Sequence, residues 1–378
     1  MKKYLIFITI ITVGVILRLF VSRLGHNFDL ESYWIVGDIV TRGGNVYSET
    51  TRYNYGPIWF YIIGLFYLCT EYFGRGFNFF GFLISLFLTC VDLGIFYILY
   101  KKYNLFTASL FFLNPISIII TGYHRQFDNL AILVALIGLY FIPNNITVKK
   151  AFLISLVLGT SITIKHVFFL LPLWLFFSKD IKGWNNKFII LILPILIFIF
   201  SFVPFWSIGS EGIINNVFLY KSFANSPFWF IFSPLQLRDF FSSIFMFILV
   251  LSIFGFILKN LKAFDLGLFY TLILVVFAPA IANQYLAICI AAISAYPNIF
   301  FFLYTYTSSL LLFKDGAGLS RPLYTSNLPF DSLILHTNIR AYDLIVLFLW
   351  FGLIHELFKR YSKVFQKVNS FIYKKLNI

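Results

Sequence analysis

The feature that most constrains this chain is a succession of long apolar segments separated by short polar turns. The first is LIFITIITVGVILRLFV at residues 5–21, and 60% of all residues are hydrophobic whereas 12% are charged. Because about a quarter of an ordinary soluble domain is charged, this composition excludes one. Roughly 20 apolar residues in a helix cross a bilayer core of about 30 Å. The sequence therefore predicts an all-α polytopic integral membrane protein.

Applying that length to each apolar segment predicts about 12 transmembrane helices, several of them shorter than a full span. The expected spans are 4–21, 79–100, 105–122, 129–142, 151–164, 166–178, 188–206, 240–258, 264–281, 285–297, 299–313 and 342–357. The apolar stretch within 56–73 is predicted to be a juxtamembrane helix at the outer interface, where Trp59 and the tyrosines are favoured. The alternative, a full span there, would invert every later loop.

Lysines orient the predicted spans. The pairs Lys101–Lys102 and Lys149–Lys150 and the basic tail are expected on the cytoplasmic side, under the positive-inside rule. Both termini are then cytoplasmic in a plasma (inner) membrane. Residues 22–78 form a large first extracytoplasmic loop, and most of the arginines fall on that outer side. Because Arg binds phosphate or carboxylate through two parallel hydrogen bonds, an outer site for an anionic substrate is expected.

The whole chain, 1–378, is predicted to be one domain with two halves. Residues 1–206 form a catalytic half with outer loops 22–78 and 123–128. Residues 207–378 form a more variable half with outer loop 314–341 and a basic tail, 358–378. The tail alternates lysines with aromatic and aliphatic residues, which is typical of an amphipathic helix on the inner leaflet. The bilayer is thus an expected partner, and nucleic acid is not.

Polar motifs gather at the predicted outer ends of the spans. They are HNFDLESYW (26–34) with RYNYGPIW (52–59) in the first loop, GYHRQFDN (122–129), TIKHVFFLLP (163–172) and APAIANQYLAI (278–288). Polar side chains at membrane level are costly unless they face water or a ligand, so these residues are the candidate site. The candidates are Asp29, Glu31, Tyr55, His124, Arg125, Gln126, Asp128, Lys165, His166, Gln284 and Tyr285.

Each candidate also has a structural explanation. Asp29 could be the N-cap of a helix that begins at LESYWIV, with Glu31 as a first-turn acid beside it. Lys165 could extend to the interface, and Gln284 and Tyr285 could anchor a helix end. Asp92, in the middle of the span 79–100, is expected to pair with another helix.

Taken in order, the first-loop acid, the Tyr-Gly-Pro element, NP followed by GYHRQFDN, the isolated Ile-Lys and the late Gln-Tyr resemble the GT-C glycosyltransferases. These multi-pass enzymes use polyprenyl-phosphate sugars, and the similarity is nearest to mannosyltransferase-like and DUF2029-like members. It extends over about residues 1–290. The resemblance implies that Asp29 is the catalytic base, that Asp128 is the acid of the second outer turn, and that Lys165 is the motif lysine.

What the resemblance implies for substrates is a polyprenyl-phosphate sugar donor, with mannose as the first expectation, and a glycan, lipid or protein acceptor. The transfer would invert the anomeric carbon. The sequence Asp29-Leu30-Glu31 departs from a strict DxD motif, so a divalent metal is possible but no metal ligand is predicted. No cysteine pair has the spacing of a zinc site.

Two other classes of function remain open. A transporter or flippase of a lipid-linked saccharide would show repeats with broken helices in corresponding places, whereas the motifs here crowd into the first half. A non-catalytic membrane subunit would leave the acids dispensable.

The orientation can be tested by cysteine labelling of Ser48→Cys and Ser362→Cys in intact cells. We expect a membrane-impermeant reagent to label position 48 and not position 362, because the lysine distribution places the first loop outside and the tail inside. Labelling at position 362 would contradict the predicted topology.

Overall fold

The computed structural model describes residues 2–142, 146–220, 244–314, 318–319 and 341–362. Every regular element in these ranges is a helix, which confirms the all-α class. Most of the predicted outer loop 314–341 and most of the tail 358–378 lie outside the described residues.

The first half of the chain contains these helices: α1 (Lys2–Val21), α2 (Phe28–Thr41), α3 (Val46–Glu49), α4 (Pro57–Tyr72), α5 (Phe77–Lys102), α6 (Leu105–Phe112), α7 (Pro115–Ile119), η1 (Ile120–His124), α8 (Asp128–Tyr140), α9 (Val148–Ile164), η2 (His166–Phe168), α10 (Leu171–Phe177) and α11 (Trp184–Phe200). The second half contains η3 (Val203–Phe205), α12 (Trp206–Gly212), η4 (Ile213–Phe218), α15 (Ile244–Ile257), α16 (Ala263–Phe277), η6 (Asn283–Ala287), α17 (Ile290–Ala295), α18 (Ile299–Lys314) and α20 (Ala341–Tyr361).

Four helical segments of the described chain are long and apolar enough to cross a membrane: Tyr4–Val21, Phe77–Lys102, Trp184–Phe218 and Ala341–Tyr361. A fifth is the pair Leu105–Phe112 and Pro115–His124, which is bent by 48°. Further apolar helices, such as α8 and α16, have only 10–17 residues. The expected count of about 12 spans is therefore not confirmed, because many predicted spans fold as helices shorter than the bilayer core requires.

The sequence Leu113-Asn114-Pro115 causes the bend between α6 and α7. Asn114 caps α7, since its side chain accepts a hydrogen bond from Ile116 N at 3.0 Å. Pro115 occupies the first helical position, where its missing N–H costs nothing, but it cannot continue the preceding helix. The chain therefore changes direction within a few residues.

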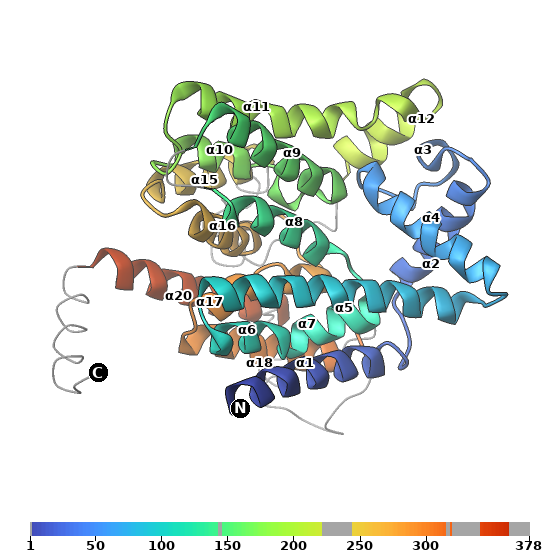
Figure 1. Cartoon of the computed structure of the whole chain (residues 1–378), viewed down its shortest axis with the longest axis horizontal. Coiled ribbons are helices and arrows are strands. Elements are labelled where there is room, and N and C mark those ends of the chain that lie inside the picture. Colours follow the sequence, from blue (N-terminus) through green and yellow to red (C-terminus); the bar gives the residue numbers. More distant parts are fainter. Residues whose placement is uncertain (1, 143–145, 221–243, 315–317, 320–340, 363–378) are drawn as a thin grey trace.

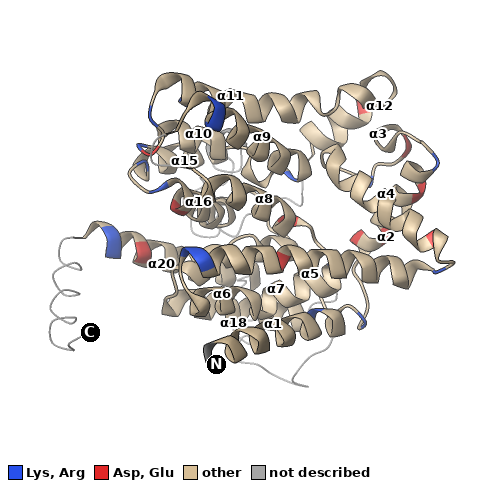
Figure 2. Ribbon diagram, viewed as in Figure 1, with Lys and Arg blue, Asp and Glu red and all other residues tan. Residues whose placement is uncertain are grey.

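Helices α1, α5 and α11 run across Figure 1 in roughly the same direction, and α2, α3 and α4 gather at the right-hand end of α5. Basic and acidic residues both lie at the left, where α20 carries the two side by side, and acids and bases also mix around α2–α4 (Figure 2). The described residues therefore do not show the separation of charge that the lysine pattern predicted for two opposite faces. The assignment of those faces to the two sides of a membrane stays a prediction.

Helix α4 covers most of the stretch 56–73 for which a juxtamembrane helix is predicted, and its position in a membrane stays a prediction. Its 16 residues span about 24 Å, less than a bilayer core. One face packs against α2 through the buried Trp59 and Ile63, whereas Tyr61, Leu65 and Leu68 are exposed on the other. An exposed apolar stripe at helical spacing suits a helix that lies in the outer leaflet.

A buried ion pair joins the helices that carry the candidate site. Arg18 Nε of α1 lies 2.8 Å from Asp92 Oδ2 of α5, and both side chains are 0% exposed. Ser117 of α7 and Thr121 of η1 donate to Oδ2 at 3.3 and 2.8 Å, and Asn129 of α8 donates to Oδ1 at 2.6 Å. The predicted pairing of Asp92 with another helix is therefore confirmed, with Arg18 as its partner.

The remaining donors of Arg18 are also satisfied. Its NH1 donates to Gly14 O at 3.2 Å and to Phe112 O at 2.7 Å, and its guanidinium lies 4.3 Å from the centroid of the Phe112 ring. A buried charge is tolerated only when it is paired and hydrogen-bonded in this way. Arg18 therefore ties α1 to α5 and to the end of α6.

Removing one partner of this pair should destabilise the protein more than removing both. Arg18→Met or Asp92→Leu alone leaves an unpaired buried charge, which costs about 3–5 kcal/mol, whereas replacing both charges with apolar residues is much less harmful. We expect the double variant to unfold at a higher temperature than either single variant in detergent. Arg23→Met, at an exposed arginine beyond α1, is the control and should leave the melting temperature unchanged. A double variant less stable than both singles would contradict this account.

Candidate active site

Asn27, rather than Asp29, is the N-cap of α2. The Asn27 Oδ1 accepts a hydrogen bond from Asp29 N at 3.2 Å, and the Asn27 Nδ2 donates to Asp29 Oδ2 at 2.8 Å. The interpretation of Asp29 as the helix cap is therefore wrong. Asparagine is among the best N-cap residues, so Asn27 was itself a sequence signal for a helix that begins at Phe28. The Asp29 carboxylate is left available at the start of the helix.

The turn 122–128 reaches Asp29 from the opposite side. Arg125 has φ 55° and ψ 39°, a left-handed conformation that reverses the chain between the π-helix η1 and α8. The reversal brings Gln126 back, and its Nε2 donates to Asp29 Oδ2. The Asn27 Nδ2 also lies 3.2 Å from His124 Nδ1. Because the Asn27 oxygen already accepts from Asp29 N, its nitrogen is the donor and His124 Nδ1 accepts.

The two oxygens of Asp29 have different surroundings. Asn27 and Gln126 both donate to Oδ2, and within the described chain no group forms a hydrogen bond to Oδ1. Burial of the half-exposed carboxylate raises its pKa above the ordinary value, although the hydrogen bonds from Asn27 and Gln126 and the charge of Lys165 oppose that shift. Asp29 is thus held in one orientation with one oxygen unused, and it is a stronger base than an ordinary aspartate.

Asp128 and Lys165 form a second buried ion pair beside Asp29. Lys165 Nζ lies 2.7 Å from Asp128 Oδ2, with side chains 6% and 1% exposed. The ammonium also lies 5.0 Å from the Tyr55 ring centroid and 4.8 Å from that of Phe127. Lys165 is the C-cap of α9 in an extended conformation, which explains why it projects away from the helix. Lys165 thus lies between α9 and η2, and Phe127 is a neighbour that the sequence did not single out.

The loop before α4 places Tyr55 over this ion pair. Tyr53 Oη donates to Gly56 O at 2.6 Å and accepts from Phe60 N at 3.1 Å, which fixes the turn. A Cβ on Gly56 would lie 2.0 Å from Thr163 O, so the loop touches the end of α9 directly. Burial and the carboxylates of Asp29 and Asp128 raise the pKa of Tyr55, so its hydroxyl stays protonated and can donate a hydrogen bond.

The guanidinium of Arg125 faces the chain itself. It donates to four carbonyl oxygens, those of Ser22, Gly25, Gly81 and Tyr123, and to Ser85 Oγ, at 2.7–3.2 Å. The side chain is 3% exposed. Burial lowers the pKa of Arg125 to about 10, which leaves it charged at neutral pH. In this structure Arg125 joins the ends of α1 and α5 to the turn.

The other candidates surround this centre. Glu31 is exposed on α2 and forms no hydrogen bond or ion pair within the described residues. The His166 ring stacks beside Tyr55 with centroids 6.5 Å apart. Gln284 and Tyr285 are half-buried in η6, which packs against η1 and α8. The fold therefore brings the late Gln-Tyr motif to the turn 122–128, although about 160 residues separate them in the chain.

The described residues contain no group of three or more His, Cys, Asp and Glu side chains arranged to hold a metal ion. Asp29 and Asp128 are the acids closest to the centre, and Asp128 is already paired with Lys165.

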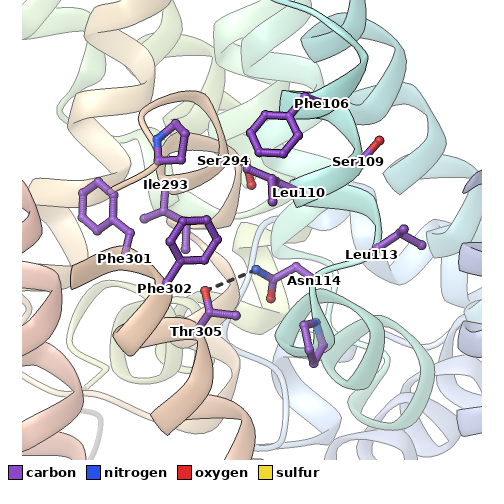
Figure 3. Close-up of a pocket in the computed structure, with 12 residues that line it drawn as sticks. Phe106, Ser109, Leu110, Leu113, Asn114, Ile293, Ser294, Phe301, Phe302 and Thr305 are labelled. Atoms are coloured by element: carbon purple, nitrogen blue, oxygen red, sulfur yellow. Dashed lines mark hydrogen bonds between the residues drawn. The ribbon is translucent and has the colours of Figure 1, made fainter. Parts of the chain in front are cut away.

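A cavity of about 240 Å³ lies away from these residues, between α6, α17 and α18 (Figure 3). Its wall is mostly apolar, with Phe106, Leu110 and Phe302 among the lining residues. At one edge Asn114 Nδ2 lies 3.5 Å from Thr305 Oγ1. The cavity shares none of its lining residues with the Asp29 centre.

Comparisons with known proteins define the class of fold. No protein-family model matches the sequence, and no characterised protein matches it in sequence. Among solved structures, ArnT from Cupriavidus metallidurans in the apo state matches with a TM-score of 0.53 and 13% identity, over 93% of this chain and 76% of ArnT. The same ArnT bound to undecaprenyl phosphate matches with a TM-score of 0.49 and 12% identity, over 92% of this chain and 75% of ArnT.

The chain therefore has an ArnT-like membrane fold, and ArnT is a GT-C glycosyltransferase. The likeness shows the fold alone, and membership of the superfamily that the motifs indicated stays a prediction. The nearer similarity to mannosyltransferase-like and DUF2029-like members is not supported by these matches. At 13% identity the likeness concerns the fold, so the activity must be argued from the residues.

The contact between the Tyr55 loop and α9 can be tested by Gly56→Ala. The added Cβ would force Thr163 O away, and overpacking of this kind costs typically about 1–3 kcal/mol. We expect a lower melting temperature. Gly76→Ala is the matched control, because no atom lies within 4 Å of a Cβ at Gly76. Equal effects of the two substitutions would contradict the close contact.

Proposed function

We propose that the protein transfers a sugar from a polyprenyl-phosphate carrier to an acceptor hydroxyl, with inversion at the anomeric carbon and Asp29 as general base. The observation that carries this proposal is the Asp29 carboxylate, which two amides orient through Oδ2 while Oδ1 has no hydrogen-bond partner in the described chain. The ArnT-like fold and the apolar helices are consistent with a lipid-linked donor.

In the proposed reaction, the acceptor oxygen attacks the anomeric carbon and forms the new glycosidic bond. The bond between the anomeric carbon and the donor phosphate oxygen breaks, and its electron pair remains on the departing polyprenyl phosphate. The acceptor proton goes to Asp29 Oδ1. One base is sufficient for a single inversion, whereas a retaining reaction needs a second carboxylate as nucleophile about 5–5.5 Å away. Asp128 is ill suited to that second role because its Oδ2 is bound to Lys165.

Lys165 is the proposed counter-charge for the leaving phosphate. Its ammonium is nearly buried, and Asp128 and the rings of Tyr55 and Phe127 keep it in place. A positioned cation in a water-poor site stabilises developing negative charge strongly without reorganising. The protonated Tyr55 hydroxyl is a second donor toward the phosphate. Gln284, Tyr285 and His166 would complete the substrate-binding wall.

Gln126, Asn27 and His124 are proposed to position the base. Gln126 and Asn27 hold Asp29 Oδ2, and His124 in turn binds Asn27. Arg125 is one of the candidate site residues, and an arginine there could bind an anionic substrate. We propose instead that it holds the turn, since its donors already bind carbonyl oxygens of the chain. Mannose is the first donor sugar to test, because the motif order most resembles mannosyltransferases.

Asp29→Asn tests the base directly. The amide keeps the size of the side chain and can still accept from Asn27 and Gln126, but it cannot take the acceptor proton. We expect turnover to fall roughly 10²–10⁴-fold, the usual contribution of a general base, with donor binding and melting temperature retained. Glycosyl transfer by the purified variant is the measurement. Turnover equal to that of the unmodified protein would exclude Asp29 as the base.

Glu31→Gln is the comparison on the same helix. Glu31 is exposed and forms no hydrogen bond in the described chain, so its loss should cost far less turnover than the loss of Asp29. A larger loss for Glu31→Gln would assign the base to Glu31.

The pH dependence gives a separate test. The base must be ionised, so kcat/KM should fall as the pH falls through the pKa of Asp29. Because burial raises that pKa, the midpoint should lie above the ordinary aspartate value of 3.8. The hydrogen bond from Gln126 lowers the pKa, so Gln126→Ala should move the midpoint to higher pH. An unchanged midpoint in Gln126→Ala would show that the fall of kcat/KM at low pH reports the titration of another group.

A further inference from the structure

Arg52 presents a guanidinium over the ring of Phe28, the residue that precedes the candidate base. Its Cζ lies 4.1 Å from the centroid of the Phe28 ring, and Phe28 directly precedes Asp29 in the first turn of α2. Arg52 is exposed, and within the described chain its side chain forms no hydrogen bond and no ion pair. Phe28 is 59% exposed, which is a large apolar area to leave at the surface. An arginine on such a ring is oriented while its N–H groups remain free at the edge.

The neighbouring arginines of the first loop differ from Arg52. Arg42 is paired with Asp38, at 3.2 Å, and with Glu49. Arg75, in the turn between α4 and α5, is exposed, but no ring or carboxylate of the described chain holds it. Arg52 alone among these three combines a ring that orients it, a guanidinium without an acidic partner in the described chain, and contact with Phe28, the residue before Asp29.

We propose that Arg52 and Phe28 form a binding site for an anionic group, a phosphate or a carboxylate, on the acceptor substrate. This inference rests on the proposed function, which it extends by naming the charge of the acceptor. An oriented guanidinium matches the two oxygens of such an anion through parallel hydrogen bonds.

The geometry of an inverting transfer assigns this anion to the acceptor. In an inverting displacement the attacking and leaving groups lie on opposite faces of the sugar ring. The base that takes the acceptor proton lies on the acceptor side, and Arg52 stacks on the exposed ring of Phe28, the residue before that base in α2. Lys165, in contrast, is nearly buried and is held by Asp128. Lys165 thus binds the anionic group of the donor, and Arg52 binds that of the acceptor.

Protection of arginine from phenylglyoxal tests this site without requiring transfer. The full-length protein in detergent is modified in sodium phosphate, sodium acetate or sodium chloride of equal ionic strength, and peptides containing Arg52 and Arg75 are quantified by mass spectrometry. We expect phosphate or acetate to slow modification of Arg52 at least threefold relative to chloride, with Arg75 unchanged. Phe28→Leu, which removes the ring but keeps an apolar side chain, should reduce the protection of Arg52 at least by half.

Two outcomes would overturn the proposal. Equal responses of Arg52 and Arg75 to all three salts would show that Arg52 is an ordinary surface arginine. Protection of Arg52 by a polyprenyl phosphate in the same detergent would assign the anion to the donor. Because these measurements report binding alone, failure of Asp29→Asn to reduce turnover would contradict the proposed base without deciding the anion site.

Discussion

The buried ion pair of Arg18 and Asp92 is the interaction on which the arrangement of the site depends. Its strength comes from its surroundings, because two charges removed from water must satisfy every donor and acceptor within the protein. Asp92 receives hydrogen bonds from α7, η1 and α8, and Arg18 binds carbonyls of α1 and α6. Apolar helix faces can shift along one another at little cost, whereas these hydrogen bonds form in only one relative position of the helices. The network therefore fixes the starts of η1 and α8 relative to α1 and α5.

The start of α8 connects this network to the candidate active site. Asn129 binds Asp92, and the preceding residue, Asp128, binds Lys165. Adjacent residues of a helix point about 100° apart, so one turn of α8 serves both ion pairs. Arg125 adds a third constraint, since its guanidinium joins the turn to Ser22 and Gly81 at the ends of α1 and α5. A rigid frame beneath the base is what an oriented catalytic group requires.

The fold places four of its basic side chains in three different environments. Arg18 and Lys165 are buried and paired, Arg42 is exposed and paired, and Arg52 is exposed without an acidic partner. Asp29 is half-buried. Burial raises its pKa, and the amides of Asn27 and Gln126 hold one of its oxygens. Penalising the ionised form of a carboxylate reduces the stability of the fold at neutral pH. Such a cost is common where a group must act as a base.

The sequence by itself indicated the all-α class of the protein and named the candidates for its site. Apolar segments with few charges can fold only as helices that satisfy their own backbone in lipid, and polar residues between them are too costly to be accidental. That reasoning identified Asp29, Asp128 and Lys165 as candidates and expected a partner for Asp92. It could not count the spans, because hydropathy does not distinguish a full span from the shorter apolar helices such as α8.

Only the tertiary structure decided which of these residues meet and which oxygen or nitrogen each one offers. The pairing of Asp128 with Lys165 and the approach of η6 to η1 join segments far apart in the chain, and no local pattern encodes such distances. The role of Arg125 depends on a left-handed backbone conformation that aims its guanidinium at carbonyl oxygens. Arg52 and Arg75 look alike in sequence, and they differ because the fold places an aromatic ring under only one of them.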